Sequence, residues 1–73
     1  MNLTEVKKGK RIQFVNDEHN HFMEVFHVMD RNMEVENGFK IRLNGELIHS
    51  YSDFQPFSRK CRYLIHEFEL DEN

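Results

Sequence analysis

Two Asn-Gly dipeptides separate short alternating apolar runs in the middle of the chain, at residues 37–38 and 44–45. Asn and Gly tolerate the positive φ angles that tight β-turns require, so each dipeptide predicts a reversal of the chain. Short strands joined by such turns form an antiparallel meander. We therefore expect an antiparallel sheet at the centre of the fold.

The alternation of apolar residues predicts the register at the second turn. A two-residue loop at Asn44-Gly45 places Leu43 opposite Glu46 and Ile41 opposite Ile48. Side chains alternate between the two faces of a sheet, so the polar face would then be separate from the apolar one. The predicted polar face carries Lys40, Arg42, Leu47 and His49.

The first turn is predicted to be longer. A two-residue loop there would set glutamates across from apolar residues, whereas a three-residue loop with Gly38 in the left-handed conformation pairs Val35 with Phe39 and Met33 with Ile41. We expect the three-residue loop. The predicted core face consists of Met33, Val35, Phe39, Ile41, Leu43 and Ile48.

Two further ordered segments are predicted before the meander. Residues 11–15 (RIQFV) have the composition of a first strand, and the polar tract at 16–21 has that of a hairpin loop. The apolar residues of segment 22–29 fit helical spacing as well as a strand. Its valines and aromatic residues favour a strand.

A helix is predicted in the C-terminal part, where apolar residues recur at the spacing of one helical face. These residues are Phe57, Cys61, Leu64, Ile65 and Phe68. Asp53 would be the N-cap with Pro56 in the first turn, and Ser52 with Gln55 as a capping-box partner is the other candidate. The competing interpretation is an edge strand over residues 62–70. In either case this segment would cover the apolar face of the sheet.

These elements predict an α+β fold: a small antiparallel meander or barrel of four to five strands, of the OB or SH3-like kind, with a C-terminal helix packed on it. A chain of 73 residues has room for one small domain, residues 1–73, with a small core. A homodimer would supply additional buried surface to a core of this size.

Composition indicates the compartment. The single cysteine, Cys61, excludes an intrachain disulfide framework and favours a reducing environment. The sequence contains no apolar run long enough to span a membrane and no signal-peptide pattern at its start. We expect a cytoplasmic protein that does not associate with membranes. The net charge of −3 argues against nucleic-acid binding driven by bulk charge.

No set of residues predicts a catalytic or metal site. His19 and His21 flank one residue of the polar loop, but a closed zinc site needs four ligands and no second pair accompanies them. Cys61 could be combined with His49 or His66 as nucleophile and base, yet it lies on the predicted apolar stripe, where a cysteine serves packing. We therefore expect neither an enzyme, nor a cofactor, nor a bound metal.

Basic and aromatic residues predict one candidate nucleic-acid surface. Cations beside an aromatic ring on an open sheet face are typical of platforms for single-stranded nucleic acid. The residues predicted to form this surface are Lys40, Arg42, His49 and Tyr51, extended by Lys8, Lys10 and Arg11. The ordinary interpretation is the solvent face of a half-buried sheet.

Residues 30–45, with the sequence DRNMEVENGFKIRLNG, resemble the strand region of staphylococcal-nuclease-like domains. The resemblance implies an OB-type barrel in which Arg42 corresponds to the strand arginine of that family. The chain carries other residues where the family has its calcium-binding and catalytic acids, which implies a barrel without that nuclease chemistry. These residues are Asn32, Leu47 and Ser50. Residues 9–16 (GKRIQFVN) also look like the first strand of SH3-like barrels.

Two functions from different classes follow. The leading hypothesis is a non-catalytic protein-interaction module that binds a larger protein, because small size and abundant phenylalanine and methionine without a reactive site are typical of small phage or mobile-element inhibitors and adaptors. Its predicted protein-binding surface is the acidic end, made of Glu67, Glu69, Asp71 and Glu72. The alternative is a nucleic-acid-binding small β-barrel that uses the Lys40, Arg42 and Tyr51 face.

Overall fold

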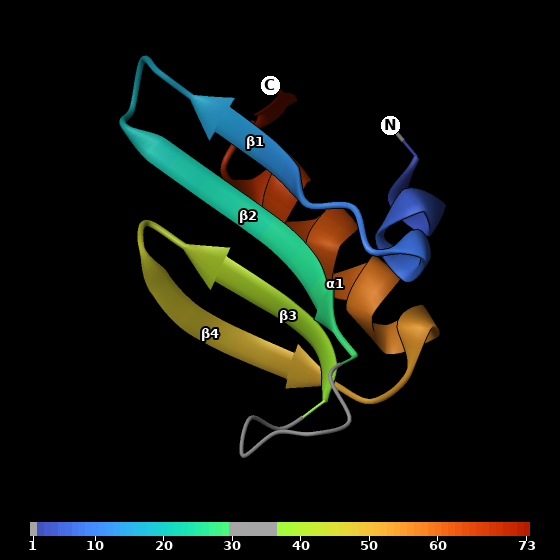
Figure 1. Ribbon diagram of the computed structural model, residues 1–73. Coiled ribbons are helices and arrows are strands. Elements are labelled where there is room, and N and C mark those ends of the chain that lie inside the picture. Colours follow the sequence, from blue (N-terminus) through green and yellow to red (C-terminus); the bar gives the residue numbers. More distant parts are fainter. Residues whose placement is uncertain (1, 30–36) are drawn as a thin grey trace.

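The predicted antiparallel meander forms the body of the protein. The computed structural model describes residues 2–29 and 37–73 and shows an α+β domain in which α1 lies across one face of an open five-stranded sheet (Figure 1). The strand order is β4-β3-β2-β1-β5. The elements are η1 (Leu3–Lys8, a 3-10 helix), β1 (Ile12–Asn16), β2 (His21–Val28), β3 (Gly38–Leu43), β4 (Glu46–Tyr51), α1 (Phe54–Glu67) and β5 (Asp71–Glu72).

Strands β1 and β2 confirm the predictions for the N-terminal half. They form a hairpin in which Phe14 pairs with Met23 and Ile12 pairs with Val25, with the polar loop between them. The segment that fitted both periods is thus a strand, as its β-branched and aromatic residues indicated. Its buried side chains on the helix side are Met23 and Val25.

The predicted partner of β3 is wrong. Both edges of β3 are occupied, since Ile41 pairs with Val25 of β2 on one side and with His49 of β4 on the other. A strand has only two hydrogen-bonding edges, so no edge of β3 remains for the pairing with residues 33–35 that the apolar pattern predicted. Met33 and Val35 themselves lie outside the described residues.

The two-residue turn at Asn44-Gly45 is confirmed, but the register changes beyond it. Both turn residues have positive φ, and Leu43 faces Glu46 as predicted. Ile41, however, faces His49 rather than Ile48, because β4 contains one extra residue at a β-bulge. The bulge moves the following residues of β4 by one position, which brings His49 and Tyr51 to the face that packs on α1.

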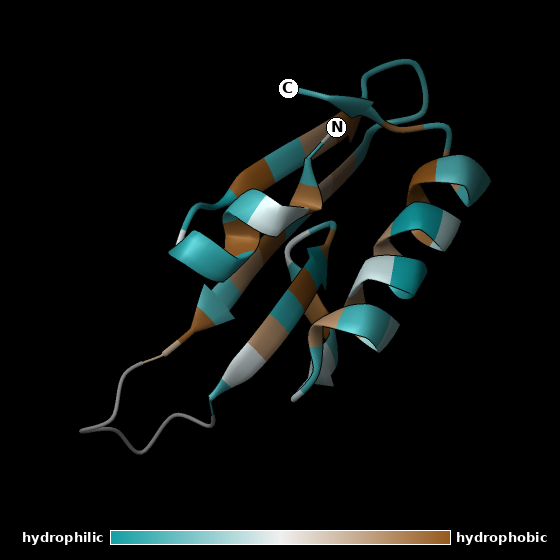
Figure 2. Ribbon diagram, turned by 90° about the vertical axis from the view of Figure 1, so that its right-hand side faces the viewer, coloured by the Kyte–Doolittle hydropathy of each residue, from teal (hydrophilic) through white to brown (hydrophobic). Residues whose placement is uncertain are grey.

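The C-terminal helix is confirmed, and the competing edge strand over residues 62–70 is wrong. Phe57 and Cys61 are fully buried on the predicted face, while Asp53 is the N-cap but makes no capping hydrogen bond with its side chain. After α1 the chain turns at Glu69, which has a φ of 51°, and only then enters β5. Figure 2 shows α1 beside the sheet as a second layer.

The core lies between these layers. It joins η1, the inner face of the sheet and α1 in one cluster of buried side chains, against which Leu43 and Ile48 are partly buried as predicted. The other face of the sheet is left open by α1. The core cluster consists of Leu3, Val6, Ile12, Phe14, Met23, Val25, Phe39, Ile41, Phe57, Cys61, Leu64 and Leu70.

Candidate functional site

The predicted nucleic-acid surface does not assemble. Tyr51 pairs with Phe39 and packs against the core, and the His49 ring stacks on Tyr51 with 5.8 Å between ring centroids. The β4 bulge has therefore placed both rings on the side of α1, away from the open face where Arg42 lies. Lys40 is only 5% exposed, and its Nζ donates a hydrogen bond to Ser50 Oγ at 2.7 Å. The prediction of one face with Lys40, Arg42, His49 and Tyr51 is thus wrong.

The surroundings of His49 on the helix side of the sheet lower its pKa. Burial, and next the positive charge of Lys60 on α1, lower the pKa of His49 below its ordinary value. His49 lies near this cation of the helix because it pairs with Ile41 and lies on the face of β4 that packs on α1.

The charged side chains of the open sheet face contact one another around Glu24. Glu24 accepts hydrogen bonds from Arg11 at 2.9 Å and from Gln13 at 3.3 Å, and its carboxylate lies 3.8 Å from the Arg42 guanidinium. The guanidinium carbons of Arg11 and Arg42 lie 4.3 and 5.4 Å from the ring centroid of Phe26. Arg42, the residue that carried the family resemblance, therefore contacts Glu24 and Phe26 of the same chain, with its side chain 42% exposed.

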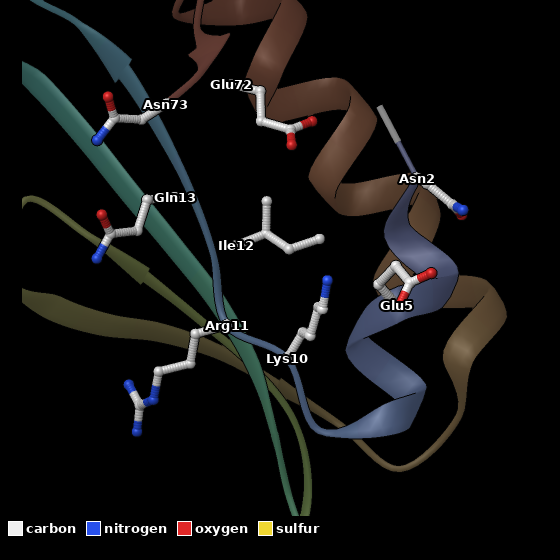
Figure 3. Close-up of a pocket in the computed structure, with 8 residues that line it drawn as sticks. All are labelled: Asn2, Glu5, Lys10, Arg11, Ile12, Gln13, Glu72 and Asn73. Carbon is white, nitrogen blue, oxygen red and sulfur yellow. The ribbon is translucent and has the colours of Figure 1, made fainter.

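A cavity of about 260 Å³ lies at the edge of β1, between η1 and β5 (Figure 3). Figure 3 shows Arg11 and Gln13 pointing away from Lys10 and Glu72, so the polar groups do not converge on a common point. The lining residues of the cavity are Asn2, Glu5, Lys10, Arg11, Ile12, Gln13, Glu72 and Asn73.

Cys61, His19 and His21, the residues considered as a nucleophile or as metal ligands, lie near other side chains of the protein. Cys61 is fully buried, and burial raises the pKa of its thiol to about 12, so the thiol is neutral at physiological pH. His21 packs edge-on against Phe68 with ring centroids 4.8 Å apart, while the ring of His19 lies 6.5 Å from that of His21. Within residues 2–29 and 37–73, no group of three or more His, Cys, Asp or Glu side chains is placed to hold a metal ion.

The side of α1 that faces away from the sheet carries exposed charged residues. The buried residues of the helix recur at three- and four-residue spacing, so the remaining positions form one exposed stripe. Tyr63 is 55% exposed, and Lys60 Nζ lies 5.0 Å from the centroid of its ring. We call this stripe the α1 outer face. It consists of Gln55, Arg59, Arg62, Tyr63, His66 and Glu67.

The predicted acidic end meets the α1 outer face at Glu67, which belongs to both. The backbone of its last part is fixed to the sheet, because Asp71 pairs with Val15 and Glu72 with Phe14, and the backbone N–H of Asn73 donates to Gln13 O at 2.8 Å. All four members, Glu67, Glu69, Asp71 and Glu72, belong to exposed or edge positions. The acidic end thus runs from the last residue of α1, through the turn at Glu69, to β5.

The charges of these two surfaces are not paired within the described part of the chain. The ion pairs there join Lys8 to Glu5, and Arg11 and Arg42 to Glu24. None includes a residue of α1 or of the acidic end. The α1 outer face and the acidic end together are therefore the candidate binding surface.

The sequence reasoning identified the acidic end but missed the α1 outer face. The available signal was the spacing of Arg59, Tyr63 and Glu67, which stand four residues apart within the predicted helix. Residues at this spacing share one side of a helix, and Phe57 and Cys61 already assigned the opposite side to the core.

Comparisons with protein-family models, with curated proteins and with solved structures find no match to this chain. In the described residues no helix has both the length and the apolar character needed to cross a membrane.

Proposed function

We propose that the protein is a non-catalytic protein-interaction module that binds a larger protein through the α1 outer face and the acidic end. The observation that carries the proposal is the contrast between two surfaces. The arginines of the open sheet face, Arg11 and Arg42, both contact Glu24, whereas the charges of α1 and the acidic end have no ion-pair partner among the described residues. Unpaired, ordered charges are available to complementary charges on another molecule.

The composition of the surface fits a protein partner. Tyrosine and arginine are enriched among residues that dominate the energy of protein interfaces. Tyr63 is the most exposed large apolar side chain of the described residues, and Arg59 and Arg62 are exposed beside it. Tyr63 would be the central anchor, and the two arginines would pair with carboxylates of the partner.

The adjoining carboxylates favour a protein over a nucleic acid. The α1 outer face carries Glu67 as well as its arginines, and Glu69 follows just beyond the helix. A nucleic-acid backbone is uniformly negative and would meet these carboxylates as well as the arginines, whereas a protein surface can present charges of both signs.

Such a module would act by occupying a surface of its partner, as an inhibitor or an adaptor does. Its buried free thiol, Cys61, fits a reducing compartment such as the cytoplasm.

Affinity capture tests this function. The intact chain is immobilised and exposed to cell lysate with and without nuclease, and the retained proteins are identified by mass spectrometry. We expect one protein retained in stoichiometric amount in both arms. Loss of every retained protein after nuclease treatment would contradict the proposal and support nucleic-acid binding.

A further inference from the structure

We propose that the α1 outer face also binds the same face of a second copy, with the two α1 helices antiparallel across a twofold axis at Tyr63. This inference rests on the proposed function, because it names a partner for the same surface. An interface of this kind is self-complementary: whatever one copy presents, the other must match.

The order of charges along α1 provides that match. Arg59 precedes Tyr63 by four residues and Glu67 follows it by four, so each lies about 6 Å from Tyr63 along the helix axis. When two such helices run antiparallel with their tyrosines opposed, Arg59 of each copy faces Glu67 of the other. The twofold axis produces this pair twice.

The parallel arrangement is excluded by the same charges. Two parallel helices in register would set Arg59 against Arg59 and Glu67 against Glu67, and like charges facing each other repel. Glu69, exposed just beyond the helix, adds a second carboxylate at the acidic half of the face. The antiparallel arrangement therefore brings the cationic half of each face to the acidic half of the other.

The exposed aromatic ring lies at the centre of this arrangement. Tyr63 is 55% exposed, and in the antiparallel pair it would be covered by its symmetry mate. Aromatic rings favour offset or edge-to-face contact with each other, which a twofold axis permits. A chain of 73 residues has a small core, so surface buried between copies adds appreciably to what the fold itself buries.

A charge swap tests the inference on the purified full chain. Sedimentation equilibrium over a concentration series measures the dimer dissociation constant of the wild type, of Arg59→Glu, of Glu67→Arg and of the double variant. Each single reversal creates two repulsive contacts across the axis, so we expect the dissociation constant to rise at least about tenfold. The double variant should return to within about threefold of the wild type.

Mixing the two single variants gives the sharpest result. In the mixed dimer every facing pair joins opposite charges, so we expect the equimolar mixture to dimerise although neither variant does so alone at the same concentration. The variant Lys10→Glu changes an exposed cation elsewhere and should leave the dissociation constant unchanged. Circular dichroism melting confirms that every variant is folded.

Two outcomes would overturn the inference. The wild type could stay monomeric at every concentration, or it could dimerise with no response to the reversals, which would assign the contact to another face. Either result together with capture of a lysate protein that depends on Arg59 and Arg62 leaves the proposed function standing. If the same amount of lysate protein is captured when both arginines are substituted, the result contradicts the proposed function.

Discussion

The guanidinium of Arg11 lies over the ring of Phe26, with 4.3 Å between its central carbon and the ring centroid. Phe26 belongs to the open face of the sheet, yet it is only 8% exposed. Arg11 also donates to Glu24 at 2.9 Å, so one side chain shields the ring and neutralises the carboxylate beside it. This arrangement explains how an aromatic residue is buried on a face that α1 does not cover.

We expect Arg11→Ala to lower the free energy of unfolding by about 1 kcal/mol, because an exposed cation–π contact and an exposed ion pair each contribute a fraction of this amount. Urea denaturation measures the change. The matched control is Lys10→Ala, the neighbouring exposed cation, which should change stability by less than about 0.5 kcal/mol. Equal effects of the two substitutions would contradict the role of Arg11.

Gly38 is required by the close approach of β4. Its φ is 143°, and a Cβ at this position would lie 2.7 Å from the carbonyl oxygen of Tyr51. We expect Gly38→Ala to cost about 3 kcal/mol, since backbone strain adds to a clash with backbone that cannot easily move. Gly45→Ala is the control: its φ is 86° and no atom lies within 4 Å of the added Cβ, so about 1 kcal/mol is expected. Thermal or urea unfolding that ranks them in the reverse order would refute this account.

The buried thiol of Cys61 makes stability fall at high pH. Burial raises the pKa of Cys61 to about 12, from 9.0 for an unperturbed thiol. Between these values the unfolded chain loses the thiol proton while the folded chain retains it, so stability is fully present below pH 9 and decreases as the pH rises toward 12. Urea unfolding at a series of pH values should show a smaller decrease for Cys61→Ala than for the wild type.

The same burial predicts slow modification of Cys61. A thiol reagent at pH 8 should react with the folded protein only as fast as the chain opens, and quickly after denaturation. Rapid stoichiometric labelling of the folded protein would show that the thiol is accessible.

The ionisation of His49 reports the packing of β4 on α1. Burial and the charge of Lys60 lower its pKa, so the unfolded chain gains the imidazole proton at a higher pH than the folded chain does. This contribution to stability is present above the ordinary pKa of 6.5 and is lost as the pH falls through it toward the lowered value. Lys60→Gln should raise the pKa of His49 partway toward 6.5 in an NMR titration, because the larger cause, burial, remains. An unchanged pKa would place His49 away from the helix.

The sequence predicted most elements but not the register of β4. The Asn44-Gly45 turn, β1, β2 and the buried face of α1 follow from turn chemistry and periodicity. The bulge does not, because Leu47 and Ile48 are consecutive apolar residues and either can face the core without breaking the pattern. The extra residue of the bulge places His49 and Tyr51 on the face that packs on α1, so they do not share the open face with Arg42 as the predicted nucleic-acid surface required.

Of the candidate binding surface, the sequence predicted the acidic end but not the α1 outer face. Charge composition identified the acidic end directly. The α1 outer face required two steps, first the helix and then the side left over by its buried residues. Whether its charges were paired depended on contacts between distant segments, such as that of Arg11 with Glu24, which periodicity alone does not reveal.

Binding through α1 can be tested directly by comparing two double variants in capture experiments with nuclease treatment. Arg59→Ala/Arg62→Ala removes the cations of the α1 outer face, and Lys8→Ala/Lys10→Ala removes the same charge from exposed positions elsewhere. We predict that the arginine variant retains less than about a tenth of the partner bound by the wild type, which corresponds to a loss of about 1.4 kcal/mol or more, while the lysine variant retains nearly all of it. Equal retention by the two variants would contradict binding through α1.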